Sequence, residues 1–234
     1  MHSRSLRSAR ALCLVALGVF LSTRADAQDH LDGTIASNPA ADLGSLYAWM
    51  DGGAVVLALT VYPSAPAGAH FSATTQYAFH LSSRTALASG APQAEEVICT
   101  FDASQVAQCW GGGEYVRGDA GAAAGLSSAD GKLKVYAGLR ADPETWNRVG
   151  FNATVAAVQA ASPSLTFDAG GCPAVGAAVS GALVNLLAHD GSGGPPTNGF
   201  ASQNVLALVV RIDKALVTSG GPVLGVWAST HAVP

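Results

Sequence analysis

Short runs of alternating or continuous apolar residues, separated by turn residues, recur along the chain. Residues 54–62 (AVVLALTVY) are almost continuously apolar, which predicts a central strand buried on both faces. Residues 75–83 alternate instead, and this pattern predicts a strand with an apolar face and a polar face that carries His80. The same reasoning predicts further strands over residues 96–101, 132–140, 204–212 and 223–229.

Helical signals are few in this sequence. Residues 175–189 are rich in Ala, Leu and Val, have helical length and follow Pro173, which is typical of a helix start. Residues 190–199 (DGSGGPPTNG) predict a loop, as does the Ala- and Gly-rich stretch 120–125. Many strands with one or two short helices predict an all-β fold, an antiparallel β-sandwich or jelly roll.

The first residues have the organisation of an export signal. Residues 1–27 combine an arginine-containing start, an apolar stretch over residues 11–21 and a small-x-small cleavage pattern at residues 25–27. The apolar stretch is shorter than the about 20 residues that a membrane-spanning helix needs. We therefore expect a signal peptide over 1–27, a mature chain that forms one β-sandwich domain over 28–234, and a secreted or periplasmic location.

Composition narrows the classes of function. Charged residues make up only 12% of the 234 residues, with 12 Lys+Arg against 16 Asp+Glu. Removal of the expected signal takes away four arginines and one aspartate, which makes the mature chain more acidic. Nucleic-acid binding is excluded because the clustered basic residues that neutralise phosphates are missing. Beyond the signal, no stretch of the sequence predicts a membrane-spanning helix.

Three cysteines remain in the expected mature chain. Cys99 and Cys109 lie in two strand-like runs around a turn, which predicts an inward-facing cross-strand disulfide in an oxidising compartment. Closing so short a loop stabilises the fold by about 2–3 kcal/mol in the chain-entropy model. For Cys172 we expect a buried, small apolar side chain rather than a reactive thiol.

Three segments carry a family resemblance. They are DHLDGTIASNPAADLGSLYAW with the strand that follows it, VYAGLRADP at residues 135–143, and NVLALVVRIDKALV with the later GVWAST. Together they resemble the exported bacterial family known only as domain of unknown function 4331, a resemblance that implies export but no activity. The order of strands is also similar to haem- and carbohydrate-binding β-sandwich modules of the DOMON type, a likeness of fold alone.

A metal site is predicted near the start of the mature chain. His30, Asp32 and Asp42 offer an imidazole and two carboxylates, and His-x-Asp on an extended segment places both side chains on one face. These groups are suitable ligands for a divalent cation. The alternative is a solvated N-terminal arm with Asp42 capping a turn.

Two further sets of residues are candidates for ligand binding. Arg140 and Asp142 are candidates to orient a polar ligand, but a local ion pair or an Asx-turn that leads into Pro143 is the favoured interpretation. Trp110, Tyr115 and Trp146 form either a platform for sugar stacking or part of the core.

These observations leave two hypotheses of function. The first is an exported β-sandwich that binds a small molecule, a glycan or a protein without catalysis, because the common catalytic motifs are missing from the sequence. The second is a metal-dependent hydrolase that uses His30, Asp32 and Asp42. The two differ in a simple way, because the enzyme needs these three side chains to converge at a single site.

Overall fold

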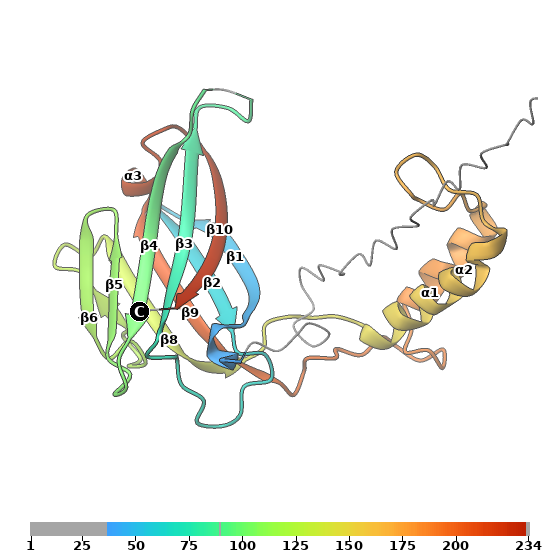
Figure 1. The fold of residues 1–234 in the computed structure, drawn as a ribbon, viewed down its shortest axis with the longest axis horizontal. Coiled ribbons are helices and arrows are strands. Elements are labelled where there is room, and N and C mark those ends of the chain that lie inside the picture. The colour runs from blue at the N-terminus through green and yellow to red at the C-terminus, as the bar shows by residue number, and fades with distance from the viewer. Residues whose placement is uncertain (1–36, 89, 233–234) are drawn as a thin grey trace, which may run out of the picture.

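Two antiparallel five-stranded sheets form a β-sandwich (Figure 1). The computed structural model describes residues 37–88 and 90–232. The predicted all-β sandwich is thereby confirmed. The elements in chain order are η1 (Pro39–Ala41), β1 (Leu43–Asp51), β2 (Ala54–Val61), β3 (Thr75–Arg84), β4 (Gln93–Phe101), β5 (Ala107–Gly111), β6 (Glu114–Gly118), β7 (Leu126–Ser127), β8 (Leu133–Ala141), α1 (Arg148–Ala161), η2 (Ser162–Ser164), α2 (Ala177–Leu187), β9 (Asn204–Asp213), α3 (Lys214–Val217) and β10 (Val223–Ala232).

The order of strands brings distant parts of the chain together. Sheet A has the order β1-β2-β9-β8-β7, and sheet B has the order β10-β3-β4-β5-β6. The predicted central strand is β2, which pairs with β1 on one side and β9 on the other. The last strand, β10, returns to sheet B and pairs with β3 over its whole length. All six strands expected from the sequence are present, the strand-like run around Cys109 is β5, and β1, β6 and β7 add to them.

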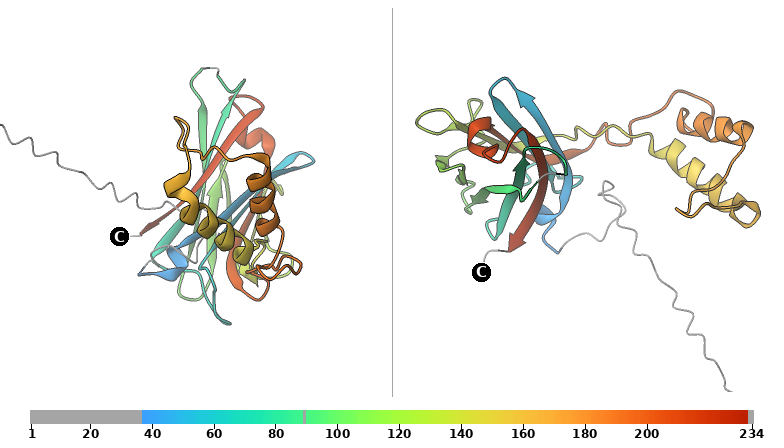
Figure 2. Two further views of the ribbon diagram at one scale, coloured as in Figure 1. Left: turned by 90° about the vertical axis from the view of Figure 1, so that its right-hand side faces the viewer. Right: turned by 90° about the horizontal axis from the view of Figure 1, so that it is seen from above.

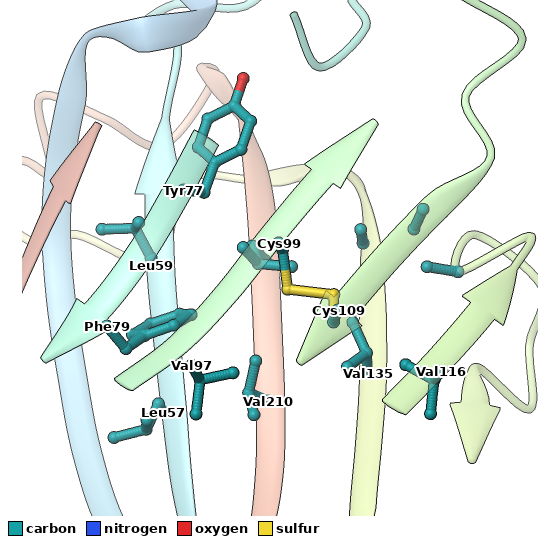
Figure 3. Close-up of a cluster of buried hydrophobic side chains, with 14 of the residues drawn as sticks. Leu57, Leu59, Tyr77, Phe79, Val97, Cys99, Cys109, Val116, Val135 and Val210 are labelled. Atoms are coloured by element: carbon teal, nitrogen blue, oxygen red, sulfur yellow. A yellow bond between two sulfur atoms is a disulfide. The ribbon is translucent and has the colours of Figure 1, made fainter. Parts of the chain in front are cut away.

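The core lies between the inner faces of the two sheets (Figure 3). Alternating residues of β3 and β4 meet alternating residues of β2, β8 and β9, as the period of two predicts. Tyr77 is the largest fully buried side chain, and its ring packs edge-on against Phe71 and Phe101. Its hydroxyl donates to the carbonyl oxygen of Ala40 at 2.8 Å and accepts from the backbone N–H of Ser72 at 3.0 Å. The buried phenol therefore has a partner both as a hydrogen-bond donor and as an acceptor.

The predicted disulfide is confirmed. Cys99 of β4 and Cys109 of β5 are directly opposite each other in the register and are bonded, with both side chains fully buried (Figure 3). Beyond this pair, Gly112 and Gly113 connect β5 to β6 with φ values of 58° and 80°. A two-residue hairpin with two positive φ angles favours glycine at both positions, because side chains are strained there.

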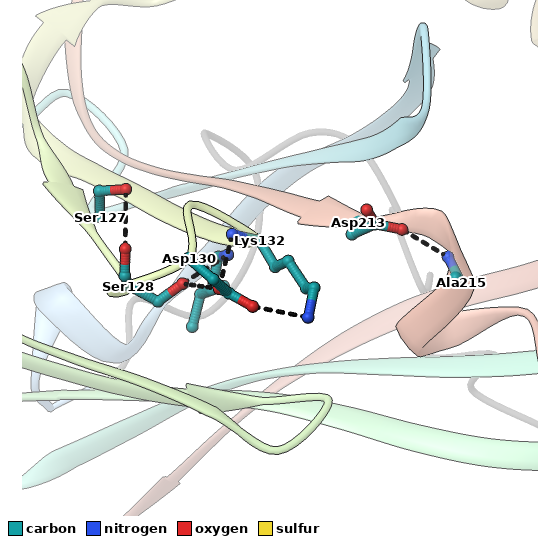
Figure 4. Close-up of polar contacts among 7 residues, drawn as sticks. Ser127, Ser128, Asp130, Lys132, Asp213 and Ala215 are labelled. Carbon is teal, nitrogen blue, oxygen red and sulfur yellow. Dashed lines mark hydrogen bonds and ion pairs between the residues drawn. The ribbon is translucent and has the colours of Figure 1, made fainter.

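Short polar contacts fix the ends of other elements (Figure 4). In the turn between β7 and β8, Asp130 accepts from the hydroxyl of Ser128 and forms an ion pair with Lys132 at 2.6 Å. The Lys132 ammonium group lowers the pKa of the Asp130 carboxyl below its usual range. Asp213 ends β9 and caps α3 by accepting from the backbone N–H of Ala215.

A helical hairpin is inserted in the chain between the paired strands β8 and β9 and lies to one side of the sandwich (Figure 2). Its second helix, α2, confirms the helix expected over residues 175–189, whereas α1 was not expected. Asn147 links the two helices, because its side chain accepts from Gly150 N–H in α1 and donates to the carbonyl oxygens of Leu187 and His189. Gly150 is buried at this contact, where a Cβ atom would lie 2.5 Å from the carbonyl oxygen of Leu186.

The hairpin leaves apolar side chains in solvent. In the hairpin and its connecting loop, the exposed large apolar residues are Val149, Phe151, Phe167, Val179, Val184 and Leu187. Cys172 lies in the loop between the helices and is exposed, so the expected burial of this side chain is wrong. Cys172 lies in a glycine-containing turn, where its backbone N–H donates to the Asp168 carboxylate. This turn lies outside the core, so the thiol is exposed. No helix in the described part of the chain is long and apolar enough to cross a membrane.

Candidate functional site

Of the three residues of the predicted metal site, the structure describes only Asp42. His30 and Asp32 lie outside the described residues, so their position relative to Asp42 stays a prediction. Asp42 ends η1, and its backbone carbonyl accepts from Tyr62 N–H at 3.0 Å. Within residues 37–88 and 90–232, no group of three or more His, Cys, Asp or Glu side chains is arranged to hold a metal ion.

Arg140 and Asp142 make local contacts at the end of β8. The Arg140 guanidinium lies over the ring of Tyr136 at 4.4 Å and donates to the carbonyl oxygen of Leu139. Asp142 is 8% exposed, and its carboxylate accepts from the backbone N–H of Glu144 at 2.9 Å. This is the Asx-type turn that was the alternative to a ligand-binding role.

Glu144 in turn joins this turn to the outer face of sheet A. Its carboxylate accepts from the hydroxyl groups of Ser45 at 2.9 Å and Tyr47 at 3.1 Å. Burial raises the pKa of the Tyr47 phenol, and the negative charge of Glu144 adds to this effect. Glu144 therefore forms a structural connection between β1 and the segment after β8.

The outer face of sheet B concentrates exposed aromatic rings. Trp110 of β5 and Tyr115 of β6 are 43% and 45% exposed, and their ring centroids are 5.4 Å apart. Trp227 of β10 is 57% exposed and stacks on the imidazole of His80, with centroids 3.6 Å apart. Contiguous exposed apolar patches of more than a few hundred Å² are rare on monomeric proteins and often mark a binding site. Two of the three residues expected as a sugar platform, Trp110 and Tyr115, therefore lie together.

Trp146 does not join this face. It lies in the segment that leads into α1, where its ring contacts Phe151 and Phe200. Phe200 is almost completely buried, so this aromatic group is part of the packing at the base of the helical hairpin. For Trp146 the structure favours the packing alternative over the platform.

A depression of about 270 Å³ lies beside Trp110 on sheet B. Its lining comes from β4, from the β5–β6 turn and from the two aromatic residues. The residues are Glu95, Glu96, Ile98, Trp110, Gly111, Gly112, Gly113, Glu114 and Tyr115. The rings provide apolar surface and the carboxylates provide hydrogen-bond acceptors, which is the usual combination in small-molecule sites.

Next to this depression, four polar side chains form a continuous line of hydrogen bonds. Glu96 Oε1 is 2.8 Å from His80 Nδ1, and His80 Nε2 is 2.7 Å from Ser229 Oγ. The same Ser229 Oγ is 2.7 Å from His231 Nε2. Glu96 and His80 are directly opposite each other on β4 and β3, and Ser229 is the diagonal neighbour of His80 on β10. All four side chains therefore belong to the outer face that carries the aromatic rings.

Sequence reasoning identified only part of this group. It placed His80 on the polar face of its strand, which is correct, but it did not connect this residue with Glu96, Ser229 or His231. Alternation along β10 indicates which residues face outward together. The pairing of β10 with β3 has no local signal, because the two strands are far apart in the sequence.

Comparison of the chain with protein-family models, with curated proteins and with solved structures finds no match. The resemblance to domain of unknown function 4331 and the weaker likeness to DOMON modules therefore stay predictions. The outer face of sheet B is the best-supported candidate site on the geometry of this chain alone.

Proposed function

We propose that this protein is an exported glycan-binding module, and that the glycan lies across the outer face of sheet B. The exposed pair Trp110 and Tyr115 is the observation that carries this proposal. Aromatic rings provide a large apolar surface at low entropic cost, and flat rings pack well against the C–H faces of sugars. Carboxylates and amides on neighbouring outward positions supply the hydrogen bonds that a polyhydroxylated ligand needs.

The spacing of the aromatic residues favours an oligosaccharide over a single sugar. Trp227 lies on β10 and Trp110 on β5, which are three strands apart in the order of sheet B. At about 4.8 Å between neighbouring strands, the two rings are separated by roughly 14 Å across the sheet. A linear oligomer reaches both rings, whereas one sugar ring contacts only one of them.

A location outside the cytoplasm would be consistent with glycan binding. A disulfide between Cys99 and Cys109 fits an oxidising compartment, where polysaccharides of cell envelopes and surroundings are available. The signal peptide expected over residues 1–27 would direct the chain there. The alternative, a metal-dependent hydrolase, depends on His30 and Asp32 and stays a prediction.

A glycan array with the full-length protein tests the proposal, followed by calorimetry with an oligosaccharide series of the best ligand. Trp110→Ala should weaken binding at least tenfold, because central aromatic anchors contribute about 2 kcal/mol or more. Trp49→Ala is the matched control, since Trp49 is 49% exposed but belongs to β1 of sheet A. Equal losses in both variants, or affinity that does not rise with chain length, would contradict the proposed site.

A further inference from the structure

We infer that Ser229, His80 and Glu96 form a nucleophile–base–carboxylate triad that hydrolyses carboxylic esters at the outer face of sheet B. This activity goes beyond glycan binding, and its three reacting side chains are not the aromatic rings that carry that proposal. The distances are 2.7 Å from Ser229 Oγ to His80 Nε2 and 2.8 Å from His80 Nδ1 to Glu96 Oε1. Both lie within the range expected for a hydroxyl nucleophile, its base and the group that orients the base.

The hydrogen-bond directions agree with these roles. Glu96 as a carboxylate only accepts, so His80 Nδ1–H donates to it, and the neutral ring then presents Nε2 as an acceptor. Ser229 donates its hydroxyl proton to that nitrogen. This is the tautomer that a general base needs, and it follows from the partners of the ring rather than from its sequence position.

The imidazole is held in this position by packing as well as by hydrogen bonds. Trp227 stacks on the His80 ring with an angle of 12° between the ring planes. The His80 side chain is 15% exposed, whereas the Glu96 side chain is 53% exposed. A base that is fixed on one face and open towards a half-buried serine is arranged for a reaction at the surface of the sheet.

His231 supplies a donor on the other side of the nucleophile. Its Nε2 is 2.7 Å from Ser229 Oγ, whose own proton is already donated to His80, so His231 donates here. Gln76 is directly opposite His231 in the register, and its amide lies on the same face. We assign the oxyanion of the acyl-transfer reaction to this side of Ser229, a role that side-chain donors fill in other enzymes.

The reaction proceeds in two steps, acylation of Ser229 and hydrolysis of the acyl-enzyme. Ser229 Oγ attacks the carbonyl carbon of the ester and its proton passes to His80 Nε2; the C–O bond then breaks, and the alcohol leaves with that proton. Water next attacks the acyl carbon and gives a proton to His80. The bond to Ser229 Oγ breaks, the carboxylic acid leaves, and the serine recovers its proton.

A fluorophosphonate probe and p-nitrophenyl acetate test the inference with the full-length protein. We expect the probe to modify Ser229, located by peptide mass spectrometry, and Ser229→Ala to lose both labelling and at least 90% of the ester hydrolysis. Ser82→Ala is the matched control, because Ser82 faces outward on β3 two residues from His80. Hydrolysis or labelling that survives unchanged in Ser229→Ala would overturn the inference.

Glu96→Gln separates a positioning role from a structural one. The side chain is exposed, so we expect the variant to keep the melting temperature of the parent protein. It should lower kcat for the ester at least tenfold and leave KM within twofold, because the carboxylate acts through His80. An unchanged kcat would refute the triad. Glycan binding that persists while labelling of Ser229 fails would overturn the esterase alone.

Discussion

Replacing Tyr77 with phenylalanine should make the stability of the sandwich less sensitive to alkaline pH. Burial raises the pKa of Tyr77 from its ordinary value of 10 to about 12. Between these two values the unfolded chain loses the phenolic proton while the folded protein keeps it. Stability that is fully present below pH 10 is therefore lost as the pH rises towards 12. The shift corresponds to roughly 2–3 kcal/mol at 1.36 kcal/mol per pKa unit.

The same substitution has a second effect at neutral pH. It removes the hydroxyl that donates to Ala40 and accepts from Ser72, which should cost about 1–3 kcal/mol. Urea unfolding at several pH values between 8 and 11.5 measures both effects. The difference in free energy between Tyr77→Phe and its parent should shrink above pH 10, since only the parent has the phenol to ionise. A Cys172→Ser background in both proteins prevents thiol exchange at high pH. A difference that stays constant with pH would refute the reasoning.

Two further predictions concern the disulfide and the helical hairpin. The double variant Cys99→Ala/Cys109→Ala should lose about 2–3 kcal/mol in urea unfolding under oxidising conditions, and a strong reductant should cause a similar loss in the parent but none in the variant. Gly150→Ala should reduce the helical signal in circular dichroism without lowering the melting temperature of the sandwich, because a Cβ there meets backbone oxygens of the α2 end. A lower melting temperature in this variant would show that the hairpin and the sandwich unfold together.

Local patterns were sufficient to predict most of the sheet. The continuous apolar run of β2 and the alternation of β3 directly reflect burial on two faces and on one face. The disulfide followed from two nearby strands and a turn, so its partners needed no long-range information. The strand β1 was missed because it is mostly exposed along its second half, including Trp49 and Met50.

The candidate site could not be predicted in the same way. Each of its residues lies on the side of its strand that alternation indicates, but the site depends on which strands are neighbours. Ser229 reaches His80 only because the chain passes from β9 in sheet A to β10 in sheet B, where β10 pairs with β3. Helix α1 was missed for a related reason. Its amphipathic pattern is no weaker than that of α2, but its single buried residue contacts α2 rather than the core.

The helical hairpin leaves and re-enters sheet A at two neighbouring strand ends. Ala141 and Asn204 pair directly in sheet A, and Asp142 N–H donates to the Gln203 carbonyl oxygen. The ends of the segment 143–203 are therefore only one strand spacing apart, about 5 Å. A tight turn of a few residues can replace the whole segment and keep the register of β8 and β9, at the loss of the Glu144 contacts to β1 and of the buried Phe200 ring. The sandwich thus offers a ready insertion point, where a foreign domain can be exchanged for the helices without disturbing the opposite sheet.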